Sequence, residues 1–156
     1  LFTIYYLLFT IYVWDFTRYL HQYYVHMEET YDFSSQNGVK ELMSYIRENQ
    51  DKYSKIIITD KYDQPYILTL FYLRYPPEKF QGTHVLTSRD QFGFSTVKEF
   101  DKFVFQDLPF ENWDKIKAEN PGAMIVGSDK EVPDAANVLK TFYFPSGRIA
   151  FQAVAN

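Results

Sequence analysis

The stretch DKYDQPY, residues 60–66, carries the side chains best suited to bind a ligand. It follows the apolar run KIIIT, residues 55–59, and precedes a helical pattern that begins at Pro65, so we expect it to join a strand to a helix. Ligands of open α/β sheets bind at the carboxyl ends of strands, and a helix N-terminus offers free N–H donors. The position therefore suits a binding loop.

The residue types in this loop fit a sugar. Tyr62 and Tyr66 would stack on the sugar ring, and Asp63 and Gln64 would bond its hydroxyl groups. The predicted ligand-binding residues are Asp60, Tyr62, Asp63, Gln64 and Tyr66. A capped turn with Pro at the first helical position explains the same residues without any ligand, and turn residues at strand–helix junctions in general favour that simpler interpretation.

Other patterns that carry chemistry are missing from the sequence. His21 and His26 are five residues apart, which places them on different faces of an α-helix rather than at the i, i+4 spacing of zinc sites; the third histidine is His84. Gly127 follows an apolar run, but the residues after it lack the glycine pair and lysine of a phosphate-binding loop. No G-x-S-x-G elbow is present, and the chain has no cysteine. We therefore predict no catalytic residue and no metal site in this chain.

The chain opens with the uncharged stretch LFTIYYLLFTIYVW, residues 1–14. Fourteen residues are fewer than the roughly 20 that span a bilayer, so we expect the outer end of a longer membrane helix. Aromatic residues with a polar edge suit the lipid headgroup zone, and the predicted membrane-interface residues are Tyr5, Tyr6, Tyr12, Trp14 and Tyr19. A helix buried in the domain itself is the alternative.

The residues after Trp14 indicate which side of the membrane the domain occupies. Between Asp15 and Lys40 the flank has several acidic residues and only one Arg, whereas cytoplasmic flanks are enriched in Lys and Arg. We therefore expect residues 1–24 to be the end of a transmembrane helix with an interfacial helix, and residues 25–156 to be an extracytoplasmic α/β domain.

Composition excludes one class of partner and suggests another. Among 156 residues the formal net charge is -4, and no basic run is present to neutralise phosphates, so nucleic acid is an unsuitable partner. Phe, Trp and Tyr make up 20% of the chain, more than a core of this size needs. This aromatic surplus suggests an interface with membrane lipid or with a sugar ring.

Hydrophobic periodicity predicts alternating helices and strands. A helix capped by Ser34 or Ser35 would bury Val39, Leu42, Met43 and Ile46, and a second helix from Pro65 would end at Pro76–Pro77. The predicted strands are residues 55–59, a half-buried strand over 102–108 and a buried one over 123–127; a short helix over 111–120 lies between the last two, and residues 81–96 hold a strand and a turn. The segments around the turn PSGR form a C-terminal hairpin. The fold class is therefore a small, three-layer-like α/β domain with a mixed sheet and a C-terminal β-hairpin, preceded by a truncated transmembrane helix.

Three phrases in this order resemble the C-terminal region of bacterial membrane glycosyltransferases of the dolichyl-phosphate-mannose–protein mannosyltransferase and aminoarabinose-transferase-like family. They are RYLHQYYVH, NGVKELMSYIRENQDKYSKIIITDKYDQPYILTLFYLRYPPEKFQ and NVLKTFYFPSGRIAFQAVAN. In the family we expect a Trp-x-Tyr-Gly phrase before the first soluble helix. Here Ser35, Gln36, Asn37 and Gly38 stand at that place, so only the glycine agrees.

The resemblance implies a polytopic enzyme that takes a sugar from a polyprenyl-phosphate carrier on the outer face of the membrane. In that family the catalytic carboxylate lies in an early loop between membrane helices and often engages a divalent metal, and nothing in this chain corresponds to that loop. The chain itself would need no cofactor. Its partners would be membrane lipid, the remaining membrane domain of the same protein, and a sugar or lipid-linked sugar. A membrane-tethered binding module without transfer chemistry is the alternative.

Overall fold

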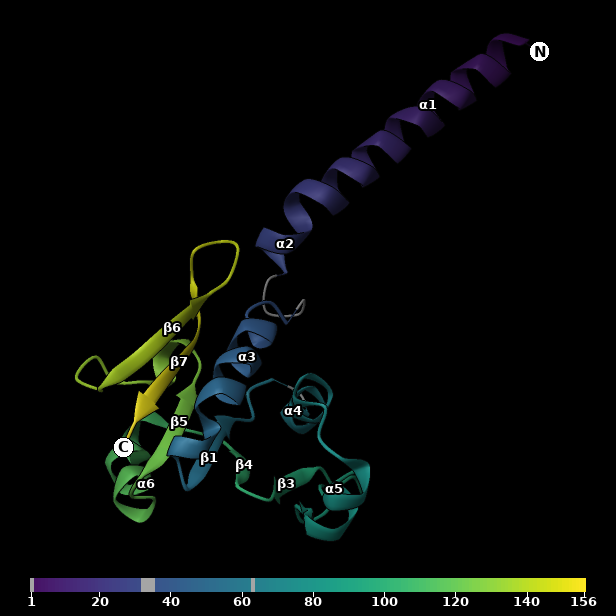
Figure 1. Ribbon diagram of the computed structural model, residues 1–156. Helices are drawn as coiled ribbons and strands as arrows, with labels where there is room; N and C mark the ends of the chain where they lie inside the picture. Colours follow the sequence, from purple (N-terminus) through teal and green to yellow (C-terminus); the bar gives the residue numbers. More distant parts are fainter. Residues whose placement is uncertain (1, 32–35, 63) are drawn as a thin grey trace.

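The computed structural model describes residues 2–31, 36–62 and 64–156, without the side chains of Glu28 and Glu29 (Figure 1). The helices are α1 (Phe2–His21), the π-helix η1 (Gln22–His26), α2 (Met27–Thr30), α3 (Val39–Asn49), α4 (Pro65–Leu73), α5 (Pro77–Thr83) and α6 (Trp113–Glu119), with short 3-10 turns η2 (Gln50–Lys52), η3 (Phe110–Asn112) and η4 (Asp129–Glu131). The strands are β1 (Lys55–Thr59), β2 (Val85–Leu86), β3 (Val97–Phe100), β4 (Phe103–Gln106), β5 (Ala123–Gly127), β6 (Val138–Tyr143) and β7 (Ile149–Ala155).

The strands form one seven-stranded mixed sheet in the order β2-β3-β4-β1-β5-β7-β6. The three central strands β4, β1 and β5 are parallel, with Ile56 beside Phe103 on one side and beside Met124 on the other. The outer pairs β2–β3, β3–β4, β5–β7 and β6–β7 are antiparallel. The predicted α/β class and the C-terminal hairpin are confirmed.

Helices cover both faces of the central strands, which is why these strands are apolar without alternation. Ile56 and Ile58 face a core with the α3 residues Val39, Leu42, Met43 and Ile46, as the predicted apolar face of that helix requires. Ile57 faces the opposite core with Trp113 and Ile116 of α6. The sheet is therefore the middle of three layers.

Helix α3 begins in a way that its sequence pattern did not indicate. The predicted cap residues Ser34 and Ser35 lie outside the described residues. The residue directly before the helix is Gly38, with a φ of 85°, a left-handed conformation that glycine adopts without steric cost. A Cβ here would also lie 3.2 Å from the Cβ of Ala150, so β7 packs closely against this helix start.

Two predictions about strands need correction. Strand β4 is buried over Phe103, Val104 and Phe105 rather than half-buried, because it lies inside the sheet and α6 covers its second face. The interval 81–96 contains the end of α5, the two-residue strand β2 and a turn, and only the strand and turn were expected. By contrast, α4 begins at Pro65 and ends before Pro76–Pro77 as predicted.

The N-terminal helix α1 projects away from the sheet (Figure 1). None of its residues is buried, so the alternative of a helix packed into the domain is wrong. Among the described residues no helix is both long and apolar enough to cross a membrane. The predicted origin of residues 1–24 in a membrane helix stays a prediction.

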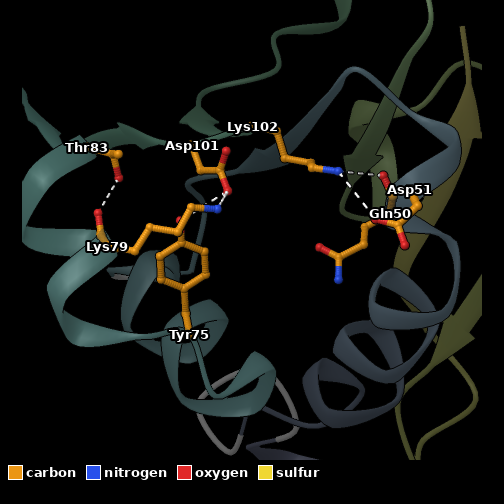
Figure 2. Close-up of polar contacts among 7 residues, drawn as sticks. All are labelled: Gln50, Asp51, Tyr75, Lys79, Thr83, Asp101 and Lys102. Carbon is orange, nitrogen blue, oxygen red and sulfur yellow. Dashed lines mark hydrogen bonds and ion pairs between the residues drawn. The ribbon is translucent and has the colours of Figure 1, made fainter.

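The turn between β3 and β4 is joined to helices on two sides (Figure 2). Asp101 accepts hydrogen bonds from the Lys79 ammonium at 2.6 Å and the Tyr75 hydroxyl at 3.0 Å. The neighbouring Lys102 donates to the carbonyl of Gln50 at 2.9 Å, at the end of α3. These contacts fix α5 and α3 to the same turn.

Replacing Asp101 tests how much its contacts with Lys79 and Tyr75 stabilise the fold. The hydrogen bond from Lys79 is the main cause that lowers the pKa of Asp101 in the folded protein. The pair therefore stabilises the fold at pH values above the pKa of this carboxyl in the unfolded chain. This contribution is lost as the pH falls through the lower pKa of the folded state. We expect Asp101→Asn, which tolerates the left-handed φ of 50° at this position, to lower the Tm by about 2 °C at neutral pH, because the pair is partly exposed. Calorimetry should find that the difference disappears in acid. An undiminished difference there would contradict the electrostatic explanation.

Candidate functional site

The carboxyl ends of the three parallel strands gather polar side chains at one edge of the sheet. Strand β1 ends with Thr59 and is followed by Asp60, β4 is followed by Asp107, and β5 is followed by Ser128 and the turn η4. Ligands of open α/β sheets bind at this edge. Strand β7 starts at the same edge, because Gly127 at the end of β5 pairs with Gln152 near the beginning of β7.

A buried carboxylate organises this edge. Glu131 accepts a hydrogen bond from the Thr59 hydroxyl at 2.9 Å, and its second oxygen accepts from the Ser128 amide at 2.7 Å and the Ser128 hydroxyl at 2.8 Å. The bond from the Ser128 amide is one half of a capping box over η4, and in the other half the Ser128 side chain accepts from the Glu131 backbone amide. Glu131 therefore ties the end of β1 to the loop after β5, and its oxygens are already engaged.

Removing this carboxylate should destabilise the fold. Glu131→Ala leaves the Thr59 hydroxyl and two Ser128 donors in a buried environment without their acceptor, and we expect a loss of about 3 kcal/mol in the free energy of unfolding. Denaturant titration measures this loss. The matched control Glu48→Ala removes an exposed carboxylate from α3 and should have little effect. If the two substitutions lower the free energy of unfolding equally, the hydrogen bonds of Glu131 do not stabilise the fold as proposed.

Asp60 lies close to other negative charges. Partial burial of its carboxylate is the main cause that raises the pKa of Asp60, and the charges of Asp107 and Glu131 add to it. A carboxyl whose pKa is raised in the folded state favours folding when it is protonated. Its contribution to stability is complete below the unfolded pKa and is lost as pH rises through the folded pKa.

The substitution Asp60→Asn tests this electrostatic arrangement. We expect it to raise the Tm at neutral pH by about 1–2 °C, a small effect because Asp60 as a whole is exposed, and to weaken the gain in stability on mild acidification. Thermal unfolding at several pH values measures both effects. A variant less stable than the parent at neutral pH would contradict the proposed repulsion.

The predicted sugar-binding residues do not form one exposed surface. The ring of Tyr62 is buried against Phe151, with 4.8 Å between ring centroids, so its face is covered by the core. Tyr66 is stacked on Phe80 at 6.3 Å. Asp60 and Gln64 are exposed, and Gln64 has a left-handed φ of 52° directly before α4. Asp63 lies outside the described residues, and sugar binding by this loop stays a prediction.

A small cavity of about 150 Å³ opens beside this loop. It lies between the end of β1, the start of η4 and the turn that joins β6 to β7. Its lining includes Lys61, Tyr62, Ser128, Asp129, Phe144 and Arg148. The sequence interpretation included Tyr62 among the ligand-binding residues but did not include Lys61 or Arg148. Arg148 was missed because it comes from a turn 87 positions further along the chain than Lys61, and only the sheet topology brings it here.

The two N-terminal histidines are closer than predicted. The π-helix η1 begins directly after His21 and ends with His26, and its wider turn brings the two ring centroids to 5.0 Å. On a regular α-helix the two side chains would lie on different faces. Their separation on the helix surface was therefore wrongly predicted. Within residues 2–31, 36–62 and 64–156 no group of three or more His, Asp or Glu side chains could hold a metal ion.

Comparisons with known proteins give no relative. No protein-family model, no curated protein and no solved structure matches this chain.

Proposed function

We propose that this chain is the accessory extracytoplasmic domain of a polytopic glycosyltransferase, attached to the membrane through residues 1–24 as the end of a membrane helix. The enzyme would transfer a sugar from a polyprenyl-phosphate carrier to an acceptor, with its catalytic loop outside this chain. The observation that carries the membrane part is the exposure of the aromatic helix α1.

The surface of α1 is unsuited to water. Phe2 is 91% exposed, Tyr6 75% and Trp14 70%, and no side chain of this helix is buried. The hydroxyls of Thr10 and Thr17 donate to the backbone carbonyls four residues earlier, at 2.8 Å each. Internal satisfaction of such polar groups is what an apolar surrounding requires. Lipid is the partner that fits this helix.

Polar residues begin where the aromatic run ends. A groove of about 550 Å³ follows the side of α1, η1 and α2, and Asp15, Arg18, Gln22 and His26 line it together with Tyr19 and Tyr23. Mixed polar and aromatic side chains at the end of an apolar helix fit the headgroup layer of a bilayer. The predicted interface residues Tyr5, Tyr6, Tyr12, Trp14 and Tyr19 are all exposed, which this role requires.

The transferase part of the proposal is supported by the order of the three sequence phrases that resemble the glycosyltransferase family. Catalysis, with any divalent metal, would belong to the membrane domain that this chain accompanies. The α/β domain would hold the lipid-linked sugar or the acceptor, or stabilise the membrane domain. The carboxyl edge of the sheet is the suitable surface, because it lies at the end of the domain from which α2 leaves (Figure 1).

A titration tests this function and separates it from the alternative. The full chain in detergent micelles is titrated with farnesyl phosphate carrying mannose, with farnesyl phosphate alone and with free mannose, while backbone amide shifts are followed. A transferase accessory domain should respond most strongly to the lipid-linked sugar, with shifts at residues 60–66. A response to free mannose alone would favour the membrane-tethered binding module. Silence at the carboxyl edge would remove the substrate-holding role.

A further inference from the structure

We propose that α1 is a self-association helix, and that its partner is the same helix of a second copy of this chain, parallel and in register. The proposal rests on a repeat in the sequence and on the groove that runs along this helix. It goes beyond the proposed function, because it needs neither a sugar nor transfer chemistry.

The chain from residue 2 to residue 22 consists of three copies of one seven-residue unit. The units read FTIYYLL, FTIYVWD and FTRYLHQ, so their first, second and fourth positions are always Phe, Thr and Tyr. Stacked ring pairs recur at the same interval, Tyr12 on Phe16 and Tyr19 on Tyr23, each with 6.1 Å between centroids. Contact with lipid alone requires apolar residues but no exact order. A strict seven-residue repeat keeps one face of a helix turned toward a partner helix.

One face of this helix has the spacing of a coiled-coil seam. From Ile4, steps of four and three residues lead to Leu8 and Ile11, which are d, a and d positions. These side chains are 60%, 57% and 51% exposed, so the described remainder of the chain leaves them uncovered. The same steps continue, and the seam consists of Ile4, Leu8, Ile11, Asp15, Arg18 and Gln22. Its aliphatic half suits knobs-into-holes packing against another helix.

The polar half of the seam is hollowed. Asp15, Arg18 and Gln22 all line the groove of about 550 Å³ that follows α1, η1 and α2. The rings of Tyr19 and Tyr23 also line it. A second helix that lies along the seam would fill this groove at the level of the lipid headgroups. The position of the groove therefore selects this face of the helix as the docking surface.

The opposite side of the helix remains for lipid. Phe2, Phe9 and Phe16 occupy b positions, which point away from the seam. Their side chains are exposed, from 91% at Phe2 to 48% at Phe16. Lipid and a second copy therefore contact different faces of α1, and membrane attachment does not compete with self-association.

The two charges of this segment select a parallel partner in register. Asp15 and Arg18 are the only charged Asp, Glu, Lys or Arg residues in positions 1–27. Among the described residues neither of them forms an ion pair. In a parallel, in-register pair the aliphatic layers meet themselves, and each Asp15 carboxylate lies one layer from the Arg18 guanidinium of the second copy. Opposite charges from the two copies then balance.

Other alignments are less favourable. A slip by one repeat would preserve the Phe, Thr and Tyr rows, but it would place Asp15 against Leu8 and bury a charge without a partner. An antiparallel pair with Asp15 beside Arg18 would place Ile11 against Gln22. The charged layers therefore fix the register that the repeat alone leaves open, as polar seam residues do in coiled coils.

Cross-linking tests the seam position by position, because the chain has no cysteine. The full chain in phosphatidylcholine vesicles is oxidised mildly, and denaturing electrophoresis follows the dimer. Leu8→Cys and Ile11→Cys should cross-link about tenfold faster than the matched controls Phe9→Cys and Thr10→Cys, because only seam positions of a parallel pair bring equivalent Cβ atoms within disulfide distance. Equal rates at the four positions, or faster rates at the controls, would overturn the proposal.

Charge exchange tests the register. Arg18→Glu puts acidic side chains in two adjacent layers, and we expect it to weaken association about tenfold or more. The double substitution Asp15→Arg with Arg18→Glu restores opposite charges and should recover association. Arg89→Glu makes the same change at an exposed position of the α/β domain and should have no effect. Failure of the double variant to recover, with the single variant weakened, would contradict the charged register.

Analytical ultracentrifugation of the full chain in detergent micelles measures association and counts the copies. Leu at a with Ile at d favours bundles of three or four helices over two, so we expect a mass above that of the dimer. A chain that stays monomeric at every concentration would overturn self-association. If this monomer still responds to farnesyl phosphate carrying mannose, the proposed function stands alone. If the chain associates but gives no such response, the self-association helix stands without the proposed function.

Discussion

Removing residues 1–14 should abolish binding to phosphatidylcholine vesicles and leave the stability of the α/β domain unchanged. The described part of the deleted segment, residues 2–14, exposes more than ten apolar side chains and buries none. If they enter the bilayer interface, their loss should weaken partitioning by about a thousandfold or more, since each side chain contributes on the order of 1 kcal/mol. Vesicle flotation measures the partitioning, and denaturant titration measures the free energy of unfolding.

A matched control separates this helix from apolar surface in general. Phe92 and Phe94 are 74% and 73% exposed in the loop before β3, so replacing both with Ala removes aromatic surface outside α1. We expect this double variant to bind vesicles like the parent. If the trimmed chain loses its cooperative unfolding transition, α1 belongs to the core. If it still binds vesicles, the lipid proposal for this helix is wrong.

The second large effect is expected for Phe100→Ala, which should cost about 4 kcal/mol in the free energy of unfolding. Phe100 is fully buried in β3. Its ring contacts four others, with centroid distances of 5.0 Å to Tyr75, 5.4 Å to Phe80, 5.3 Å to Phe103 and 5.7 Å to Phe105. It therefore joins the segment that contains α5 to the sheet, and truncation leaves a cavity at that junction.

Denaturant titration of Phe100→Ala should reveal this cost as a lower midpoint. The control Phe92→Ala makes the same chemical change at an exposed site and should shift the midpoint little. Because α5 depends on Phe100, hydrogen exchange in residues 77–83 should accelerate more than in α3. A uniform effect on both helices would contradict the proposed local role.

Much of the fold could be predicted because the local sequence of several segments is typical of the strand or helix that they form. Strands β1 and β5 are short apolar runs between polar segments, and Pro65 marks the start of α4. The i, i+3, i+4, i+7 spacing from Val39 to Ile46 identified the buried face of α3. In these places local sequence and tertiary burial agree.

The remaining errors arise where tertiary structure overrides local pattern. The alternation in β4 predicted a solvent-facing side, which α6 covers because the connection to β5 crosses over that face. The spacing of His21 and His26 predicted separation, which the extra width of η1 removes. In the candidate site, Lys61 lies in the predicted loop and Arg148 in a distant turn, and only the placement of β1 and β7 in one sheet brings the two residues to the same cavity.

The location of the β6–β7 turn has a consequence for how a ligand would arrive. This turn, which supplies Arg148 to the cavity, lies at the pole of the domain from which the N-terminal helix leaves (Figure 1). With that helix anchored, the cavity would stay within reach of the bilayer plane. A molecule confined to the same plane would then encounter it by lateral diffusion in two dimensions, and encounter rates would depend on surface density instead of bulk concentration.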